Sequence, residues 1–422
     1  MGDIEKKTIC LVTNWYPTKE NPYQGLFFKE QAFAVSDRYD FVIFRYYEKI
    51  RQLRGIEVYQ GNVENNTKEY EIRVRIPIYV ILANAIHDFS LKKIHHKTME
   101  GVGRYVSQVF VRFRKKRFKK ILKNYVCDDF DVLYCVDAQK EAAVVKVLSE
   151  LTGKPYIVGE HAPVPWPGTV LDDDNKAAIE QADLFMAISY DKIRQLSLLN
   201  IRLPQTVYIG NLVDESQFVL DKKKDEEHIK TFIIVAANSF YKNYDMFIEV
   251  MNRLCDITEV PFKVMIVGYG ANKGYSKDIE GFENKIHNSK FSDKAELIRE
   301  VPHSQIPEVL GRADAFVMTS IQEGQPVSAM EAACCGLPIF STRCGGVEDY
   351  VDDKIGRIYS VGDVEGMTNG LRDFLEGNTS FDSRYINDQI VSRFGNREFK
   401  KRFIDAVELV LKDGKFDYRG KI

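Results

Sequence analysis

Residues 319–338 read TSIQEGQPVSAMEAACCGLP and lead from the end of a short apolar strand pattern into a helical pattern. Pro326 suits the first turn of a helix, where a missing N–H costs nothing. Gly336 and Pro338 are typical stop signals. Glu323 is therefore expected in the loop before the helix, and Glu331 about one and a half turns inside it.

The same alternation of strand and helix extends along most of the chain, in two series. It predicts an α/β protein with parallel sheets and crossover helices. The expected strands are residues 9–13, 41–44, 132–136, 156–158, 184–188 and 207–209, then 232–235, 263–267, 296–298, 315–318 and 338–340. The expected helices include residues 138–151, 244–255, 305–312 and 327–335.

A charged segment without apolar residues, DKKKDEEH at 221–228, separates the two series. It suits a surface loop inside one domain, but the alternation restarts after it, which favours a domain boundary. We expect one domain over 1–215, a second over 225–390, and a helical segment over 391–422. Open parallel sheets bind ligands beyond the carboxyl ends of their strands. Two facing sheets would therefore form a deep cleft.

Composition excludes several classes of protein. The chain has 422 residues, 45% hydrophobic and 28% charged, which is ordinary for a folded protein and excludes disordered or collagen-like chains. The 59 Lys and Arg residues nearly balance the 61 Asp and Glu residues, so no global field favours nucleic acid.

Cysteine usage and the absence of leader patterns predict a cytoplasmic protein. The 7 cysteines have no CxxC spacing, which suits reduced thiols rather than a disulfide framework. Residues 1–7 are polar and charged with no secretory leader after them. The longest apolar run, 76–86, is shorter than the roughly 20 residues of a membrane-spanning helix.

The loop and helix at 319–338 have the chemistry of a nucleotide-sugar site. A helix N-terminus presents free N–H groups and partial positive charge, which suit a phosphate. Glu323 can accept hydrogen bonds from sugar hydroxyls beside that phosphate, and Glu331 can bind a ribose diol, as acidic residues do in dinucleotide folds. The plainer alternative is one solvated and one capping glutamate, since this spacing alone is common.

This segment resembles the retaining glycosyltransferases of family 4, which have the GT-B fold of two facing Rossmann-like domains. Their signature is a Glu, seven residues, a second Glu, an apolar helix, and then a small residue, Gly, any residue and Pro. The resemblance implies that Glu323 contacts the donor sugar and Glu331 the nucleotide ribose. It also implies that the donor meets the backbone at Gln325, Pro326, Val327 and Ser328.

Further family-like motifs lie along the second half of the chain. They are RADAFVM at 312–318, GGVE at 345–348, GRIY at 356–359 followed by Gly362 and Asp363, and NLVD at 211–214 with Phe218. In the last of these, Leu212 stands where the family has glycine. The N-terminal half resembles the family more loosely.

Residues 235–245, VAANSFYKNYD, follow a strand, and Lys242 matches the lysine that binds the donor diphosphate in this family. A lysine above a turn between strand and helix is a sound phosphate ligand, although by itself it is more often a surface lysine. Ala237 replaces the usual arginine and Asn243 the usual glycine. Either another residue supplies the missing cation, or Asn238 helps by hydrogen bonding, or donor binding is altered.

Two residues of the first half complete the expected site. Gly25 precedes a helical pattern over 26–35, and a glycine lets backbone approach a ligand closely, although an ordinary turn explains it equally well. His161 lies in the segment Gly159-Glu160-His161, which directly follows the strand over 156–158, and so points toward the cleft. By the resemblance, His161 lies near the reacting carbon of the donor sugar, whereas a lone histidine is more often structural.

Two other patterns receive plainer interpretations. Gly268, Gly270 and Gly274 have the wrong spacing for a dinucleotide fingerprint and are expected in a loop. The aspartates 172–174 match the metal motif of the other glycosyltransferase fold, GT-A, but fit a helix cap better. No His and Cys spacing suits zinc. We expect neither a metal nor a cofactor beyond the nucleotide-sugar substrate.

A basic amphipathic stretch lies at 92–123, with 12 Lys or Arg and the single acid Glu100. One interpretation of this stretch is a helix that packs against the core and exposes its basic face to solvent. A peripheral attachment to the inner face of an anionic membrane is the sharper hypothesis, since each basic residue there contributes about 1 kcal/mol. Nucleic acid is disfavoured because no aromatic-laced binding motif accompanies the stretch.

The sequence thus predicts a metal-independent retaining glycosyltransferase with a nucleotide diphosphate sugar as donor and a glycan or lipid-linked hydroxyl as acceptor. Glu323, His161 and Lys242 are the expected catalytic residues. Two alternatives stay open: a non-catalytic protein that binds nucleotide sugars within a larger assembly, and a sugar-nucleotide epimerase of the same fold. An NAD-dependent enzyme is disfavoured because residues 13–25 carry no dinucleotide fingerprint.

Overall fold

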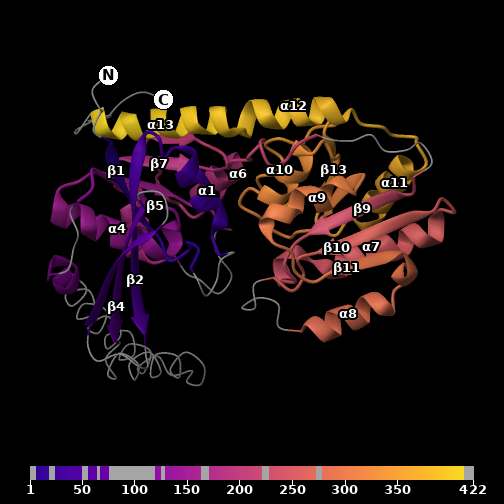
Figure 1. Ribbon diagram of the computed structural model, residues 1–422, viewed down its shortest axis with the longest axis horizontal. Helices are drawn as coiled ribbons and strands as arrows, with labels where there is room; N and C mark the ends of the chain where they lie inside the picture. The colour runs from indigo at the N-terminus through magenta and orange to yellow at the C-terminus, as the bar shows by residue number, and fades with distance from the viewer. Residues whose placement is uncertain are drawn as a thin grey trace.

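The chain forms two lobes, each built around one sheet, with two C-terminal helices along one side of both (Figure 1). The computed structural model describes residues 6–18, 24–49, 56–63, 67–75, 119–124, 129–162, 171–220, 228–271 and 278–412. We call the lobe with strands β1–β8 the first lobe and the lobe with strands β9–β14 the second lobe.

The sheet of the first lobe has eight strands in the order β3-β4-β2-β1-β5-β6-β7-β8. Neighbouring strands are parallel, except that β3 runs antiparallel to β4. The strands are β1 (Lys7–Val12), β2 (Tyr39–Lys49), β3 (Ile56–Val63), β4 (Thr67–Arg75), β5 (Val132–Cys135), β6 (Tyr156–Gly159), β7 (Leu184–Ala187) and β8 (Thr206–Tyr208).

The sheet of the second lobe has six strands, all parallel to their neighbours, in the order β11-β10-β9-β12-β13-β14. The strands are β9 (Lys230–Val235), β10 (Phe262–Val267), β11 (Ala295–Ile298), β12 (Ala315–Met318), β13 (Ile339–Thr342) and β14 (Gly356–Tyr359). The short β-branched and aromatic runs of its central strands are buried on both faces, as parallel strands require.

Helices cover both faces of each sheet. Those of the first lobe are α1 (Leu26–Ala34), α4 (Ala138–Thr152), α5 (Asp173–Glu180) and α6 (Tyr190–Leu198). Those after β9 are α7 (Tyr244–Ile257), α8 (Ile279–His287), α9 (Ile306–Gly311), α10 (Val327–Cys334), α11 (Val364–Leu375), α12 (Ser383–Phe394) and α13 (Asn396–Lys412).

Each sheet separates two apolar cores because alternate residues of a strand point to opposite faces. In β1, Ile9 and Leu11 pack with residues of α1 and α13, whereas Cys10 and Val12 pack with residues of α4. In β9, Phe232 packs with α7 and α11, whereas Ile233 packs with α9 and α10. This is the doubly wound arrangement that the alternation of strands and helices predicts.

The two C-terminal helices connect the lobes. Ile386 and Ile390 of α12 lie in the core of the second lobe, whereas Phe399 and Phe403 of α13 lie in the core of the first lobe. Figure 1 shows these helices running end to end beside both sheets. Burying one such side chain contributes roughly 1.5–3 kcal/mol, so the end of the chain ties the two lobes together.

Among its parallel strands, each sheet reverses its strand order once, and the two reversals place the ligand-binding edges. In the second lobe the order reverses at β9 and β12, and in the first lobe it reverses at β1 and β5. Loops on either side of such a reversal leave the sheet in opposite directions and open a crevice at the carboxyl ends of the strands. Residues that follow these four strands are therefore candidates for the site.

The expected α/β architecture of two sheets with a helical C-terminus is confirmed. All the strands expected from the sequence are present, and β3, β4 and β14 are additional. The sequence did not predict β3 and β4, because charged residues interrupt their apolar pattern; β3 is the edge strand of the sheet, and β4 lies next to it. It makes the first sheet mixed rather than wholly parallel.

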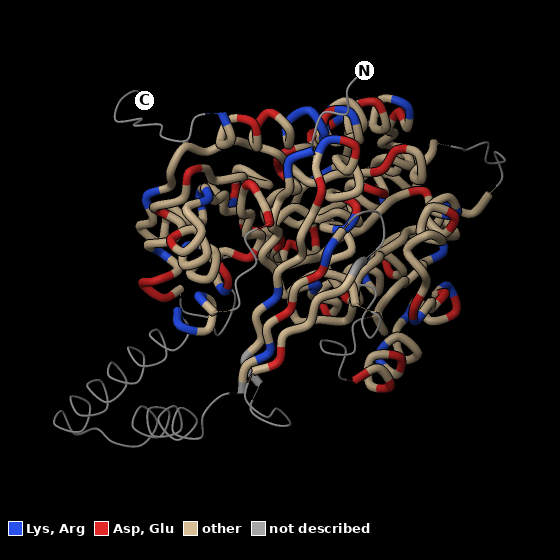
Figure 2. Tube along the Cα trace, turned by 60° about the vertical axis from the view of Figure 1, so that its left-hand side comes forward, with Lys and Arg blue, Asp and Glu red and all other residues tan. Residues whose placement is uncertain are grey.

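Two segments singled out in the sequence fall largely outside the described residues. The boundary segment 221–228 is described only at His228, and the basic stretch 92–123 only at 119–123. Over the described chain, acidic and basic residues are interspersed on both lobes (Figure 2). No helix in the described ranges has both the length and the apolar character that crossing a membrane requires.

Candidate functional site

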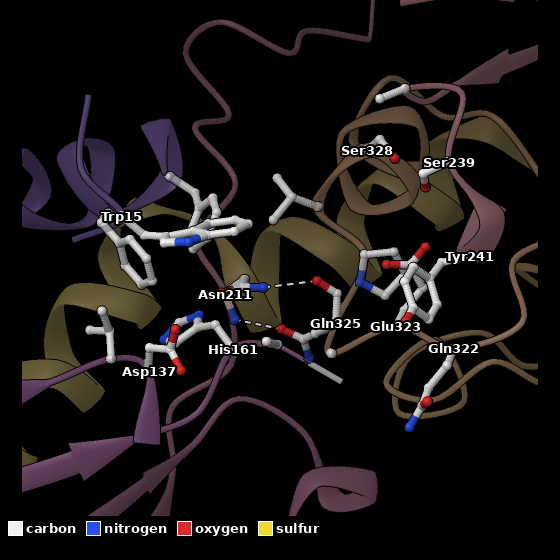
Figure 3. Close-up of a pocket in the computed structure, with 18 of the residues that line it drawn as sticks. Trp15, Asp137, His161, Asn211, Ser239, Tyr241, Gln322, Glu323, Gln325 and Ser328 are labelled. Carbon is white, nitrogen blue, oxygen red and sulfur yellow. Dashed lines mark hydrogen bonds between the residues drawn. The ribbon is translucent and has the colours of Figure 1, made fainter. Parts of the chain in front are cut away.

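A cavity of about 350 Å³ lies where the two sheet reversals face each other, with walls from both lobes (Figure 3). Its lining residues follow β1, β5 and β6 on one side and β9 and β12 on the other, so strand order explains which residues gather at the edge of each sheet, and the packing of the lobes brings the two edges together. The first lobe supplies Trp15, Phe27, Phe28, Val136, Asp137, Lys140, His161 and Ala162. The linker and second lobe supply Asn211, Ala237, Ser239, Tyr241, Lys242 and residues 322–328.

Lys242 and Glu323 form an ion pair in the wall of the second lobe, with 2.6 Å between Nζ and Oε1. They come together because β9 and β12 are neighbours in the sheet and each residue lies in the loop after its strand. Thr319, at the end of β12, donates its hydroxyl to the carbonyl of Lys242 and so joins the two loops. Both charged side chains are largely buried, which strengthens their attraction.

Backbone hydrogen bonds fix the loop that carries Glu323. The N–H of Glu323 donates to the carbonyl of Cys344 at 2.7 Å, and the N–H of Ile321 donates to the carbonyl of Tyr241 at 2.7 Å. Gly346 has φ +71°, and a Cβ there would lie 2.2 Å from the Gly324 carbonyl oxygen. The GGVE segment therefore packs backbone to backbone against the glutamate loop, and only glycine fits at 346.

Asn243 occupies the usual glycine position without loss of the backbone geometry. Its φ of +49° and ψ of +53° place it in the left-handed region, directly before α7. Asparagine tolerates this conformation better than most residues with a Cβ. The departure from the family pattern at this position therefore preserves the turn that presents Lys242.

Ala237 lines the cavity but contributes no charge. Among the described lining residues, the lysines are Lys242 on the second lobe and Lys140 on the first. Lys140 forms an ion pair with Asp137 at 3.3 Å and lies over the ring of Trp15 at 5.8 Å. Ala237, at the position where the family usually has arginine, therefore supplies no cation. Lys140 lies in the opposite wall of the cavity.

Helix α10 directs its N-terminus at the cavity. Pro326 is the residue before the helix rather than inside its first turn, and Val327 and Ser328 follow as lining residues. The first N–H groups of a helix have no partner within the helix. Together with the helix dipole, these groups make this corner of the cavity suitable for a phosphate.

His161 lies deep in the cavity wall, between the rings of Phe27 and Phe28 at centroid distances of 5.6 and 4.7 Å. Its two ring nitrogens are buried and make no hydrogen bond of ordinary geometry to the described residues. Burial, with a smaller effect from the charge of Lys192, lowers the pKa of His161 to about 3. The ring is therefore neutral at physiological pH, with one nitrogen as donor and one as acceptor.

The two lobes touch through backbone at the centre of the site. Gly324 lies so close to His161 that a Cβ at 324 would be 2.1 Å from the His161 carbonyl oxygen. On the other side of this turn, the buried Lys192 donates to the carbonyl of Ala162. The carbonyls of His161 and Ala162 are thus held between a buried cation and the glutamate loop.

The Gln325 side chain joins the lobes rather than facing open space. Its Oε1 accepts the N–H of Asn211, and its carbonyl accepts the Asn211 amide at 2.9 Å (Figure 3). Its own amide donates to the Tyr208 hydroxyl at 3.0 Å, and Gln31 of α1 donates to Asn211 at 3.2 Å. These contacts link α1, the segment between the lobes and the signature loop.

Three of the expected donor-binding residues are not among those that line the cavity. Gly25 has φ +64° and begins α1, where a Cβ would lie 2.2 Å from the Trp15 carbonyl oxygen, so it shapes the loop behind the wall. Asn238 donates its N–H to the carbonyl of Tyr269 at 3.1 Å. Glu331 is buried in α10, with its carboxylate 2.7 Å from Nε2 of His303.

Sequence reasoning missed Trp15, Asp137, Lys140 and His303. Asp137 follows β5 as His161 follows β6, so the rule that found the histidine would also have found the aspartate. Burial is the main reason that the pKa of Asp137 is raised, and its Oδ1 has no partner among the described residues. His303 left no signal in the sequence, because its partners Glu30 and Glu331 are distant along the chain.

The two patterns interpreted as non-functional have structural explanations. Asp172 caps α5, with its carboxylate accepting the N–H of Asn175 at 2.8 Å, which confirms the expected helix cap. Gly268 and Gly270 lie in a turn after β10. In the described part of the chain, no group of three or more His, Cys, Asp or Glu residues is placed to hold a metal ion.

Comparison with known sequences relates the second half of the chain to one family of glycosyltransferases. Residues 215–389 match the family model "Glycosyl transferases group 1". The gpi3 component of phosphatidylinositol N-acetylglucosaminyltransferase from Schizosaccharomyces pombe is 27% identical over 47% of this chain and 41% of its own length. The N-acetyl-alpha-D-glucosaminyl L-malate synthase of Bacillus anthracis is 25% identical over 45% and 49%. The chain thus spans less than half the length of these curated relatives.

Solved structures match nearly the whole chain. The Anabaena HepE protein in complex with UDP and glucose superposes with a TM-score of 0.65 at 13% identity, covering 95% of this chain and 99% of that one. The lipopolysaccharide outer core galactosyltransferase WaaB gives a TM-score of 0.64 at 14% identity, with coverage of 95% and 99%. At such low identity these matches establish the fold, which is GT-B.

The contact between Gly324 and the His161 carbonyl leads to a prediction about stability. Replacing Gly324 with alanine should lower the free energy of unfolding by about 1–3 kcal/mol, because the methyl group overlaps backbone that cannot move independently. Chemical denaturation of the purified variant measures this change.

Gly311→Ala is the matched control for this substitution. A Cβ at Gly311 meets no atom within 4 Å, and its φ is not in the left-handed region. Its stability should equal or slightly exceed that of the wild type, because alanine favours helix. Equal stability of both variants would contradict the close contact between the lobes.

Proposed function

We propose that this chain, whose residues 215–389 match the group 1 glycosyltransferases and which has the GT-B fold, transfers a sugar from a nucleotide diphosphate donor to a hydroxyl with retention of configuration. The observation that carries the proposal is the ion pair of Lys242 and Glu323 beside the N-terminus of α10, in a cavity shared by both lobes.

We also propose that residues 1–215, 225–390 and 391–422 are the acceptor domain, the donor domain and a connecting helical segment.

The charges of the second lobe suit the leaving diphosphate. As the bond between the anomeric carbon and the diphosphate breaks, negative charge grows on the phosphate oxygens. Lys242 and the free N–H groups at Val327 and Ser328 can stabilise that charge without rearrangement, which lowers the barrier. Because these groups supply positive charge, we expect no metal ion to be essential.

We assign Glu323 and His161 to positioning the sugar. Glu323, held by Lys242 and by its backbone hydrogen bond to Cys344, can accept hydrogen bonds from sugar hydroxyls. The neutral His161 ring can donate to another hydroxyl near the anomeric carbon. The acceptor oxygen then forms its bond on the face that the diphosphate leaves, and its proton passes to the departing phosphate, so no covalent nucleophile is required.

The comparisons support a uridine donor and an amino sugar. The HepE protein was solved in complex with UDP and glucose, and the names of both relatives contain an N-acetylglucosaminyl group. We therefore place UDP-glucose and UDP-N-acetylglucosamine first among candidate donors, with GDP-linked sugars as the alternative.

The first lobe suits a glycan or lipid-linked acceptor. Trp15 offers an aromatic surface, and Asp137 offers a buried carboxylate that can accept a hydrogen bond from a hydroxyl. We further propose a cytoplasmic enzyme, attached to the inner face of a membrane through the basic stretch 92–123, which rests on sequence charge alone. Sedimentation with vesicles containing phosphatidylserine, at low and high salt, distinguishes this attachment from a basic face that only meets solvent.

Two alternative functions differ from transfer in the products that they would form. A non-catalytic protein that binds nucleotide sugars would release no nucleoside diphosphate, and the absence of a cation at Ala237 favours it. An epimerase would convert a nucleotide sugar without an acceptor. Transfer to an acceptor hydroxyl is favoured over both by the pairing of Glu323 with Lys242 in a cavity that also has a wall from the first lobe.

A thermal-shift panel tests donor binding directly. UDP, GDP, ADP, their common sugars and NAD are compared with and without EDTA. A ligand at 100 times its dissociation constant adds about 2.7 kcal/mol of stability. We expect one nucleoside diphosphate to stabilise the protein to the same extent in EDTA, whereas stabilisation by NAD alone would overturn the proposal.

Replacing Lys242 with alanine should lower kcat by roughly 10²–10³-fold, as expected when one group that stabilises transition-state charge is removed. Release of nucleoside diphosphate from the donor identified in the panel is the measurement. Lys285→Ala is the matched control, because Lys285 is an exposed lysine of the same lobe paired with Asp245. Full activity of Lys242→Ala would exclude the assigned role of the ion pair.

A further inference from the structure

His303 lies between two carboxylates that come from different lobes. Its Nε2 is 2.7 Å from Oε1 of Glu331 in α10, and its Nδ1 is 3.1 Å from Oε1 of Glu30 in α1. The histidine itself follows β11 in a short 3-10 turn, His303–Gln305. One side chain therefore joins the signature helix of the second lobe to the first helix of the first lobe.

The geometry requires a protonated ring. Each ring nitrogen faces a carboxylate oxygen, which only accepts hydrogen bonds, so both nitrogens must donate, and only the imidazolium does so. Burial by itself lowers the pKa of His303, but the hydrogen bonds and charges of Glu30 and Glu331 outweigh it and raise the pKa to about 10. The ring therefore carries its charge at physiological pH.

Glu331 depends on this cation. Burial raises the pKa of the Glu331 carboxyl, and the hydrogen bond and charge of His303 oppose that rise. Within the described chain, His303 is the hydrogen-bond partner of the Glu331 side chain through Oε1. A buried carboxylate without a partner would be neutral or would turn toward solvent. His303 thus favours the ionised form of Glu331 and holds its Oε1 in place.

Helix α1 connects this contact to the wall of the cavity. Glu30 reaches His303, Gln31 reaches Asn211 at 3.2 Å, and Phe27 and Phe28 line the cavity around His161. A shift of α1 relative to the second lobe would therefore disturb both the carboxylate at Glu331 and the aromatic wall beside the reacting carbon.

We propose that His303 is a positioning residue for the donor ribose: it orients Glu331 toward the ribose diol and ties that orientation to α1 through Glu30. The proposal rests on the nucleotide-sugar function proposed above and deepens it by assigning how the ribose is recognised. Ribose binding is then coupled to the arrangement of the two lobes, since one ring serves both carboxylates.

The test compares three probes by calorimetry on the full chain: UDP, 2′,3′-dideoxy-UDP and inorganic diphosphate. We expect the wild type to prefer UDP over the dideoxy analogue. In His303→Ala, UDP should bind about 10- to 100-fold more weakly, as expected for loss of a hydrogen bond to a charged group. Affinity for the dideoxy analogue and for inorganic diphosphate should stay the same, so that the preference for ribose disappears.

Further variants separate positioning from folding. His303→Gln retains one donor toward Glu331 without charge and should restore part of the ribose preference. Glu30→Gln leaves the contact between His303 and Glu331 in place and should weaken UDP binding less than His303→Ala does. His287→Ala is the matched control, because His287 is an exposed histidine at the end of α8.

The outcomes are distinguishable. Unchanged preference for UDP over its dideoxy analogue in His303→Ala would overturn the role of His303 while leaving the proposed function intact. Equal loss of affinity for all three probes would show a general structural role and would also overturn it. Failure of the wild type to bind UDP, GDP or ADP would overturn the proposed function and, with it, this inference.

Discussion

The close approach of backbone at Gly324 is the constraint on which the site depends. A carbonyl from the first lobe, that of His161, lies where any side chain at 324 would begin, and Gly346 presses on the same loop from the other side. Glu323 and the N-terminus of α10 flank this contact. Because backbone cannot change rotamer, the contact fixes the distance between the two walls of the cavity more firmly than side-chain packing alone would.

The negative charges of Glu323 and Glu331 are each compensated by a nearby cation. Each glutamate of the signature already has a cation: Lys242 for Glu323 and His303 for Glu331. Taking an unpaired carboxylate out of water is costly, so these pairs allow acids to be held in a largely buried site before any ligand arrives. Under the proposed function, a donor would meet side chains that are already oriented, and its phosphates and hydroxyls would compete for partners that are present.

Helices α1, α12 and α13 also connect the two lobes. Helix α1 carries an aromatic wall, one carboxylate and one amide that reach toward the second lobe, and α12 and α13 pack on different sheets. Contacts between the lobes therefore include the backbone contact at the centre, the polar contacts of α1, the C-terminal helices, and the hydrogen bond from the N–H of Tyr190 in α6 to Asp349. Under the proposed function, a movement between the lobes would change these contacts and would couple donor recognition to the first lobe.

The sequence by itself determined the α/β class, most strands, and the positions of Lys242, His161 and Glu323 after strands, because apolar period and turn residues act locally along the chain. It also placed Glu331 inside a helix. Only the tertiary structure decided that Asp137, Trp15 and Lys140 form the opposite wall, that Gln325 serves the junction of the lobes, and that His303 is the partner of Glu331. These contacts join residues up to about 300 positions apart, as Glu30 and Glu331 around His303 show. Such proximity follows from strand order and lobe packing, which no local pattern encodes.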